Sequence, residues 1–169
     1  MQSQDFHHID EVMSQGMPVV LFDRIADQIE CDKVVVDDTQ GAYQAVSHLI
    51  GKSRKNILLL TTQDYIIVGR LRTQGYIKAI QDSSLVLDNE LIIKVVDTNN
   101  SNVALPSLEA QIEKTILKYP QIDAIFAVNE IYAAAALRVL RQARRQVPDD
   151  IAVVCFTDGL ISKFSTPTL

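Results

Sequence analysis

Five short apolar runs divide this chain, and each one stops at a small polar or acidic residue. Four of the five are followed by a segment whose apolar residues have helical spacing. Strands that are apolar along their whole length are typical of a parallel sheet covered by helices on both faces. The sequence therefore predicts an α/β fold with a doubly wound parallel sheet. The five runs are residues 18–22, 57–60, 91–96, 124–128 and 151–156.

Between these runs the apolar spacing changes to a period of about 3.6 residues, which indicates helices. Asp38 and Thr39 are candidate caps for the first helix, and Gly51 closes it. Pro106 is expected in the first turn of the third helix, and Pro120 stops that helix. The regular alternation is typical of right-handed β-α-β crossovers. The four predicted helices are residues 42–50, 68–80, 105–119 and 131–143.

The two ends of the chain fit this pattern less well. Residues 1–33 supply one helix-like stretch, one apolar run and then a polar segment, which is too little for a domain. The tail from residue 159 to residue 169 has no periodicity and ends abruptly. We therefore expect the chain to be a fragment of a longer protein, with material missing on both sides.

Composition narrows the classes of function. The formal net charge of −5 argues against DNA binding by this stretch itself, because phosphate contacts need clustered Lys and Arg. No apolar run approaches the length of a membrane span, and the polar start lacks the apolar core of a signal peptide. The two cysteines have neither metal-binding nor redox spacing. We expect a cytoplasmic protein with no metal or other cofactor and no membrane partner.

Signals of catalysis are weak. The chain has no Gly-rich phosphate loop, no GxGxxG and no GxSxG pattern. His7 and His8 are better explained by a solvated terminus than by a metal site, which needs a rigid frame. His48 is predicted on a helix surface, and Cys155 as a buried, inert thiol within a strand. We expect that the chain is not an enzyme.

Arg70 and Arg72 lie in the second predicted helix, where their side chains diverge by about 200°. One can face solvent while the other points to the crevice beyond the strand ends, where open α/β sheets bind ligands. A guanidinium can hold two oxygens of a hydroxylated or carboxylated ligand at once. Spacing alone favours two surface arginines over a ligand-binding one.

Two features of the fourth helix leave alternatives open. Arg138, Arg141 and Arg145 share one face, where cations near a helix C-terminus are favoured over a nucleic-acid patch. The run of alanines at 133–136 is explained by helix propensity, with a contact between subunits as the alternative.

Several segments, in order along the chain, resemble one family. The chain resembles the effector-binding core of LacI/GalR (lactose-repressor/galactose-repressor) transcriptional regulators, which is periplasmic-binding-protein-like. Such regulators have an N-terminal helix-turn-helix head, a hinge helix and two α/β subdomains that close on an effector. The matching segments are residues 16–24, 36–50, 72–79, 123–133 and 147–158.

The resemblance implies a domain organisation. Residues 1–35 resemble the C-terminal part of the first effector-binding subdomain, which is incomplete. Residues 36–169 resemble the second effector-binding subdomain, which lacks its final helix. The DNA-binding head would lie upstream and is absent from this stretch.

The resemblance also implies a set of effector-binding residues. Asp23 resembles the first-subdomain acid that accepts hydrogen bonds from effector hydroxyls. Arg72 resembles the arginine that clamps the effector, which reverses the preference drawn from spacing. Asn129 resembles an amide at a strand end near the pocket, and the residues after the last strand stand where an acid usually binds ligand. The full set is Asp23, Arg72, Asp97, Asn129, Thr157 and Asp158.

The chain departs from the family pattern at several of these positions. Glu130 stands where Asp is usual, and Cys155 stands where Gly is usual. Thr157 stands where relatives often have a ligand-binding Asp. Thr98 stands where relatives often place an aromatic residue that stacks on the ligand ring. These departures leave the identity of the effector open.

Together these observations predict the effector-binding core of a DNA-binding regulator, a repressor in preference to an activator. A sugar or related small metabolite would shift the balance between open and closed cores of a homodimer. Operator DNA would be bound through the absent N-terminal helix-turn-helix. The alternative is an extracytoplasmic sugar-binding protein of an ABC transporter. An enzyme on the same sheet is disfavoured, because no catalytic site is assembled.

Overall fold

The computed structural model describes residues 6–23, 28–95 and 101–169, with side chains from residue 104 in the last range. Contacts between residues divide the chain into two compact units, Met1–Asp37 and Asp38–Leu169.

Among its described residues, the first unit holds a short parallel pair of strands and one helix. Strand β1 (Val20–Phe22) pairs with β2 (Asp32–Val34), so that Phe22 lies opposite Val34. Helix α1 (His7–Ser14) precedes them and has no buried residue. The sequence predicted α1 and β1 but missed β2, because that strand is three residues long and its residues are exposed. Phe22 is 74% exposed, so this pair leaves apolar surface uncovered.

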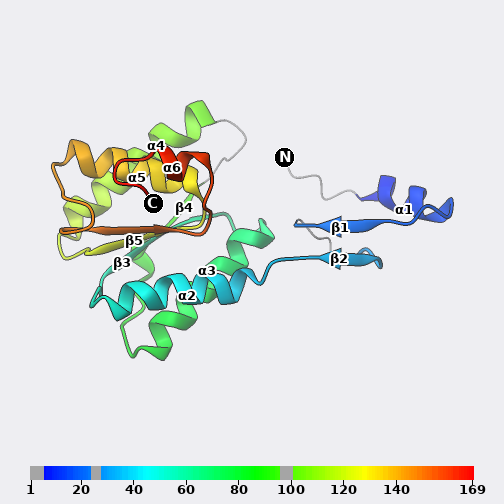
Figure 1. Cartoon of the computed structure of the whole chain (residues 1–169), viewed down its shortest axis with the longest axis horizontal. Coiled ribbons are helices and arrows are strands. Elements are labelled where there is room, and N and C mark those ends of the chain that lie inside the picture. Colours follow the sequence, from blue (N-terminus) through cyan, green and yellow to red (C-terminus); the bar gives the residue numbers. More distant parts are fainter. Residues whose placement is uncertain (1–5, 24–27, 96–100) are drawn as a thin grey trace. The chain divides into compact units, whose positions relative to one another are not determined.

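The second unit is built on four parallel strands in the order β4-β3-β5-β6 (Figure 1). The strands are β3 (Ile57–Thr62), β4 (Ile92–Val95), β5 (Ala124–Ala127) and β6 (Ala152–Cys155). The helices are α2 (Asp38–Gly51), α3 (Ile67–Asp82), the 3-10 turn η1 (Asn89–Leu91), α4 (Ser101–Lys118), α5 (Glu130–Gln142) and α6 (Leu160–Phe164).

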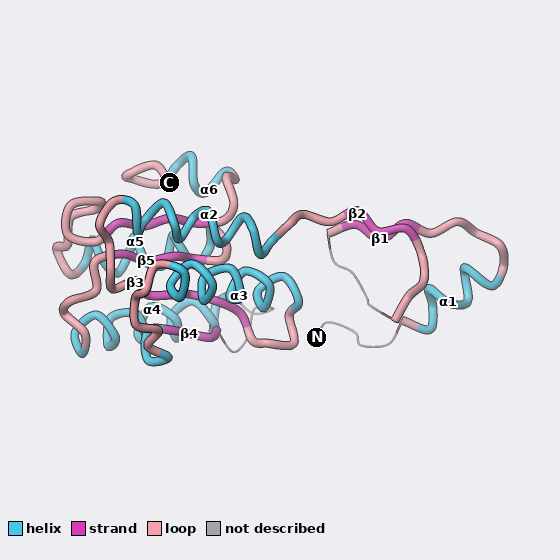
Figure 2. Tube along the Cα trace, turned by 90° about the horizontal axis from the view of Figure 1, so that it is seen from below, coloured by secondary structure: helices cyan, strands magenta, loops and turns pink. Residues whose placement is uncertain are grey.

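Helices cover both faces of this sheet. In Figure 1, α2 and α3 lie on one face, while α4 and α5 lie on the other. Figure 2 shows α3 in front of the strands when the molecule is seen from below. Every residue of β3 and β5 is buried, as central strands between two helical layers require. The predicted doubly wound parallel α/β sheet is confirmed.

The predicted helices are present, with differences at their ends. Helix α2 begins at Asp38 and ends at Gly51, the two boundary residues that the sequence indicated. Pro106 is the sixth residue of α4 and not in its first turn, because this helix begins upstream of its first regularly spaced apolar residue. Helix α6 was missed, because five residues are too few to show a helical period.

The alanines at the centre of α5 are part of the core. Ala133, Ala135 and Ala136 are at most 5% exposed, so they pack within this unit. Among the four, Ala134 alone is half-buried. Small side chains here let the helix approach the sheet, and a subunit contact is not needed to explain them.

Helices α2 and α3 approach each other closely at Gly75. A Cβ atom on Gly75 would collide with the carbonyl oxygen of Thr39 and lie 2.8 Å from the Cβ of Ala42. The Thr39 hydroxyl donates a hydrogen bond across the same interface to the carbonyl oxygen of Leu71, at 3.3 Å. Because these contacts involve helix backbone, no side-chain movement can make room for a larger residue.

We expect Gly75→Ala to lower the free energy of unfolding by about 1–3 kcal/mol, the usual effect of overpacking a core. Urea denaturation measures this difference. Gly51→Ala is the matched control, because a Cβ at Gly51 would meet no atom within 4 Å. That change should leave stability unaltered or raise it by up to about 1 kcal/mol. Equal stabilities of the two variants would contradict this account of helix packing.

Candidate functional site

The predicted site residues of the second unit lie where the parallel strands end. Arg72 comes from α3, Asn129 follows β5, and Thr157 and Asp158 follow β6. Because the carboxyl ends of parallel strands meet at one edge of the sheet, residues far apart in sequence come together there.

Arg72 is fixed at this edge by three contacts from three other segments. Its Nε donates to Asp38 Oδ1 at 2.8 Å, and its Nη1 donates to the Val128 carbonyl oxygen at 2.5 Å. Its guanidinium carbon lies 3.6 Å from the ring centroid of Phe156. The side chain is 11% exposed. These contacts use Nε, Nη1 and one face of the group, and they do not use Nη2.

The stacking of Phe156 on Arg72 depends on a glycine. A Cβ on Gly41 would lie 2.7 Å from the Phe156 ring. Gly41 therefore lets the first turn of α2 approach the ring, which in turn packs against the guanidinium. Cation–π contacts of this kind contribute more where the cation is largely removed from solvent, as at Arg72, whose side chain is 11% exposed.

Asn129 caps helix α5. Its backbone is extended, and its Oδ1 accepts a hydrogen bond from the Tyr132 backbone N–H at 2.9 Å. Capping by the oxygen leaves the side-chain NH₂ group able to donate. Since Arg72 bonds the carbonyl of the residue just before Asn129, the structure brings these two predicted residues together.

The segment after β6 is tied to the start of α5. The Thr157 hydroxyl accepts a hydrogen bond from the Glu130 N–H at 3.0 Å. The Glu130 carboxylate accepts from the Ser162 N–H at 3.3 Å and from its hydroxyl at 3.4 Å. Asp158, next along the chain, is exposed. Thr157 therefore lies beside the cap of α5, with Asp158 at the solvent side.

Cys155 differs from the sequence-based expectation of a buried residue. It is half-buried, because β6 is an edge strand of the described sheet. Its Sγ donates to the Thr157 carbonyl oxygen at 2.9 Å, which holds the turn that carries Thr157.

The two remaining predicted residues belong to other parts of the chain. Asp23 belongs to the first unit, where it directly follows β1 and is exposed. Its φ of 62° lies in the left-handed region, which Asp tolerates better than most residues, and its N–H donates to the Val34 carbonyl at 3.1 Å. Asp97 and its neighbour Thr98 lie outside the described residues.

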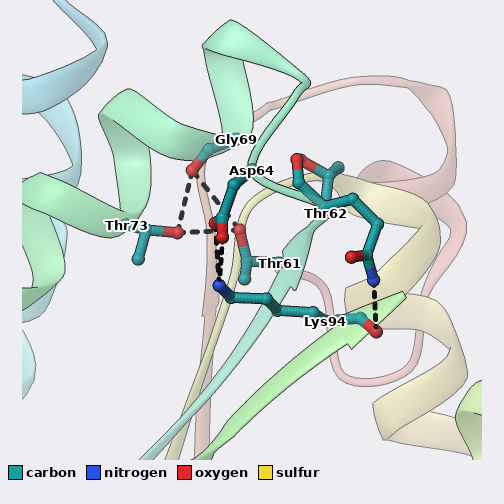
Figure 3. A network of polar contacts seen from close by, with 7 residues as sticks. Thr61, Thr62, Asp64, Gly69, Thr73 and Lys94 are labelled. Carbon is teal, nitrogen blue, oxygen red and sulfur yellow. Dashed lines mark hydrogen bonds and ion pairs between the residues drawn. The ribbon is translucent and has the colours of Figure 1, made fainter. Parts of the chain in front are cut away.

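A second polar cluster lies at the end of β3 (Figure 3). The buried Thr61 hydroxyl is 2.9 Å from that of Thr73, which donates to the Gly69 carbonyl at 2.8 Å. Nearby, Lys94 Nζ lies 2.6 Å from Asp64 Oδ2 in an exposed ion pair. The threonines join β3 to α3 one residue from Arg72, so they help to hold that arginine in position.

Sequence reasoning missed Asp38 and Phe156 as partners of Arg72. Asp38 was interpreted as a helix cap, and it is the first residue of α2. Its distance of 34 residues from Arg72 gives no local signal of the ion pair. Arg70 is exposed, as the predicted divergence of the two arginines requires.

Other features of the described residues lie apart from this edge. A hollow of about 190 Å³ is lined by Leu137, Arg141 and Phe164, among others, and contains no predicted site residue. Within residues 6–23, 28–95 and 101–169, no helix is long and apolar enough to cross a membrane. In the same ranges no three His, Cys, Asp or Glu side chains are grouped as metal ligands.

We expect Asp38→Ala to lower the free energy of unfolding by about 1.5–3 kcal/mol, because it leaves the buried Arg72 charge without its acid. Asp64→Ala is the control, since it removes the acid of an exposed pair and should cost less than about 1 kcal/mol. Urea denaturation of both variants gives the comparison. A cost for Asp38→Ala no greater than that for Asp64→Ala would show that the Arg72 pair contributes little.

Comparison with known proteins shows which family has this architecture. Residues 46–169 match the periplasmic binding protein-like domain family. The chain is 26% identical over 161 residues to the HTH-type transcriptional regulator DegA of Bacillus subtilis, covering 95% of this chain and 46% of that protein. It is 30% identical over 136 residues to the HTH-type transcriptional regulator CelR of Thermobifida fusca, covering 80% of this chain and 38% of that protein.

Solved structures give the same result. The transcriptional regulator CelR–cellobiose complex is 28% identical with a TM-score of 0.80, covering 94% of this chain and 47% of that chain. The structure of a regulatory protein of the LacI family from Chloroflexus aggregans is 26% identical with a TM-score of 0.82. The match covers 95% of this chain and 56% of that chain.

The chain spans about half the length of the curated relatives it matches, or less. The family match covers most of the chain, and the resemblance to LacI/GalR regulators drawn from the sequence is confirmed. The chain therefore belongs to the periplasmic binding protein-like domain family, in the form found in the effector-binding cores of LacI-family regulators.

Proposed function

We propose that this chain is the effector-binding core of a longer DNA-binding transcriptional regulator, a repressor in preference to an activator. The observation that carries the proposal is the arrangement of Arg72, which is fixed at the strand-end edge with Nη2 not used by its contacts to the described residues. An arginine held in this way can donate to a ligand oxygen without first losing side-chain freedom.

The effector in this proposal is an uncharged, polyhydroxylated molecule such as a sugar. The Arg72 charge is already balanced by Asp38, and the Lys94 charge by Asp64. Glu130 and Asp158 add negative charge close to the same edge. An anionic ligand would therefore gain little attraction here, while hydroxyl groups can bond the guanidinium and the Asn129 amide. Cellobiose in the complex of CelR is a ligand of this chemical class.

The proposed ligand set keeps all six residues drawn from the sequence. In the second unit it comprises Arg72, Asn129, Thr157 and Asp158, together with Asp97. Asp23 would contribute from the first subdomain, since a polar side chain directly after β1 is the counterpart of those after β5 and β6. No residue in this set is assigned a catalytic role.

We propose that residues 1–35 are the end of the first effector-binding subdomain and residues 36–169 most of the second. The division of the chain between Asp37 and Asp38 supports this boundary. The exposed apolar surface of the β1–β2 pair supports an incomplete first subdomain. The share of the relatives that is covered supports a longer protein, in which a DNA-binding head and a final helix lie outside this stretch.

In this proposal, effector binding shifts the equilibrium between open and closed cores of a cytoplasmic homodimer and so alters operator binding by the heads. The effector must bind the two states with different affinity, typically by about 1–3 kcal/mol. The names of the relatives favour a regulator over an extracytoplasmic binding protein, since they are HTH-type transcriptional regulators.

In the full-length protein, we expect Arg72→Ala to weaken binding of an uncharged sugar by about 1.5–3 kcal/mol, the contribution of a charge-assisted hydrogen bond. Titration calorimetry with glucose, galactose, maltose and cellobiose measures the affinity. Arg70→Ala is the matched control on the exposed side of the same helix and should bind as the wild type does. An unchanged affinity of the Arg72 variant would remove Arg72 from the site.

The charge balance of the edge leads to a separate expectation about ligand class. Glucose or galactose, whichever binds, should bind at least about tenfold more tightly than its 6-phosphate, because a phosphate would meet acids and already paired cations. Competition calorimetry at low and high salt provides the test. Preference for the phosphorylated sugar would mean that the effector is an anion, while the regulator assignment would stand.

A further inference from the structure

Tyr132 has a buried hydroxyl without a hydrogen-bond partner. The residue lies in the first turn of α5 and is 4% exposed. Among the buried side-chain oxygens and nitrogens of the described residues, its hydroxyl is the atom that makes no hydrogen bond of normal length and angle. Buried polar groups are nearly always paired, because an unpaired one loses its bonds to water and gains nothing in return. A buried hydroxyl without a hydrogen-bond partner therefore requires an explanation.

The position of Tyr132 connects it to the candidate site. Its backbone N–H bonds Asn129 Oδ1, so the two residues belong to the same capping turn. Burial raises the pKa of the Tyr132 phenol, and Tyr65 raises it further. The Asn129 amide lies near enough to lower this pKa as a weak hydrogen-bonding neighbour, but it does not complete a hydrogen bond with the hydroxyl. The phenol thus has Asn129 as a neighbour and, at longer range, Tyr65 from the segment between β3 and α3. It remains protonated, and therefore a hydrogen-bond donor, at neutral pH.

We propose that Tyr132 is an effector-contacting residue, whose hydroxyl donates to an oxygen of a hydroxylated ligand directly or through a bound water. This inference rests on the proposed function and adds a residue to it that the sequence did not single out. The ligand would supply the partner that the protein alone does not. Because the bond forms only when ligand is bound, it contributes its full value to discrimination between hydroxylated and apolar ligands.

The segment that carries Tyr65 lies between β3 and α3 at the strand-end edge. Tyr65 is 59% exposed. The segment is tied to β4 by the Asp64–Lys94 ion pair and by Gln63 Nε2, which donates to the Lys94 carbonyl at 3.2 Å (Figure 3). The ion pair is largely exposed and so adds little stability. In this proposal, a shift of this segment admits the ligand to the hydroxyl.

A purely structural tyrosine predicts a different outcome from an effector-contacting one. If the hydroxyl is only tolerated in the core, Tyr132→Phe removes an unpaired polar group, stabilises the protein and leaves ligand binding unchanged. If the hydroxyl contacts the effector, the same change stabilises the ligand-free protein but weakens binding. The two effects of the effector-contacting role have opposite signs, which general damage to the fold cannot produce.

The experiment compares Tyr132→Phe with the wild type in the full-length protein. Urea denaturation without ligand gives the midpoint, and calorimetry with glucose, galactose, maltose and cellobiose gives the affinity. We expect the midpoint to rise and the affinity for the bound sugar to fall about three- to tenfold, the usual effect of one neutral hydrogen bond.

Tyr76→Phe is the matched control. Tyr76 is also buried, but its hydroxyl donates to the Ile57 carbonyl at 2.9 Å, at the opposite end of β3 from the candidate site. Its replacement should lower the midpoint and leave sugar affinity unchanged.

Three results would overturn the inference. Unchanged affinity of Tyr132→Phe, while Arg72→Ala weakens binding, would refute the role of Tyr132 and leave the proposed function intact. A lowered midpoint of Tyr132→Phe would show that the hydroxyl already has a partner. Failure of the wild type to bind any of the four sugars would instead count against the proposed ligand class, and the inference would fall with it.

Discussion

The guanidinium of Arg72 is the interaction on which the strand-end edge depends. It joins the first residue of α2, the end of β5 and the ring that follows β6, all from a position on α3. A charge that is 11% exposed needs both an opposite charge and hydrogen bonds, since removal from water is costly. Asp38 supplies the charge, and its place at the start of α2 also favours that helix electrostatically. The contacts that hold this edge together are therefore also the contacts that orient the arginine.

The residues around Arg72 also combine a structural contact with the capacity to bind a ligand. The strands themselves are buried, so polar groups can reach a ligand only beyond their ends. Asn129 and Thr157 are both used there to satisfy backbone N–H groups at the start of α5. Each keeps hydrogen-bonding capacity after capping, namely an amide NH₂ and a hydroxyl hydrogen. Substitutions at these positions will therefore alter helix stability together with any effect on ligand binding.

The sequence predicted the elements whose signal is long and strongly periodic. Continuous apolar runs located β3 and β5, and Asp38 with Gly51 bounded α2, because burial and capping act locally. Strand β2 and helix α6 were too short to show a period. The Arg72–Asp38 pair was missed because it is tertiary, and Tyr132 because an aromatic residue beside alanines reads as core packing. The ring of Tyr132 is indeed buried in the core. The sequence does not show that its hydroxyl lacks a hydrogen-bond partner.

Some site groups are held in place before a ligand binds and others are not, and this difference determines how a ligand could shift the open–closed equilibrium. Arg72 and Asn129 are already held in place, so their contacts would require little ordering on binding. Contacts that are equally available in open and closed states give affinity but shift no equilibrium. The shift must come from groups that meet the ligand in one state only. Under the proposals made above, the Tyr132 hydroxyl and the Asp23 carboxylate are the groups expected to behave in this way.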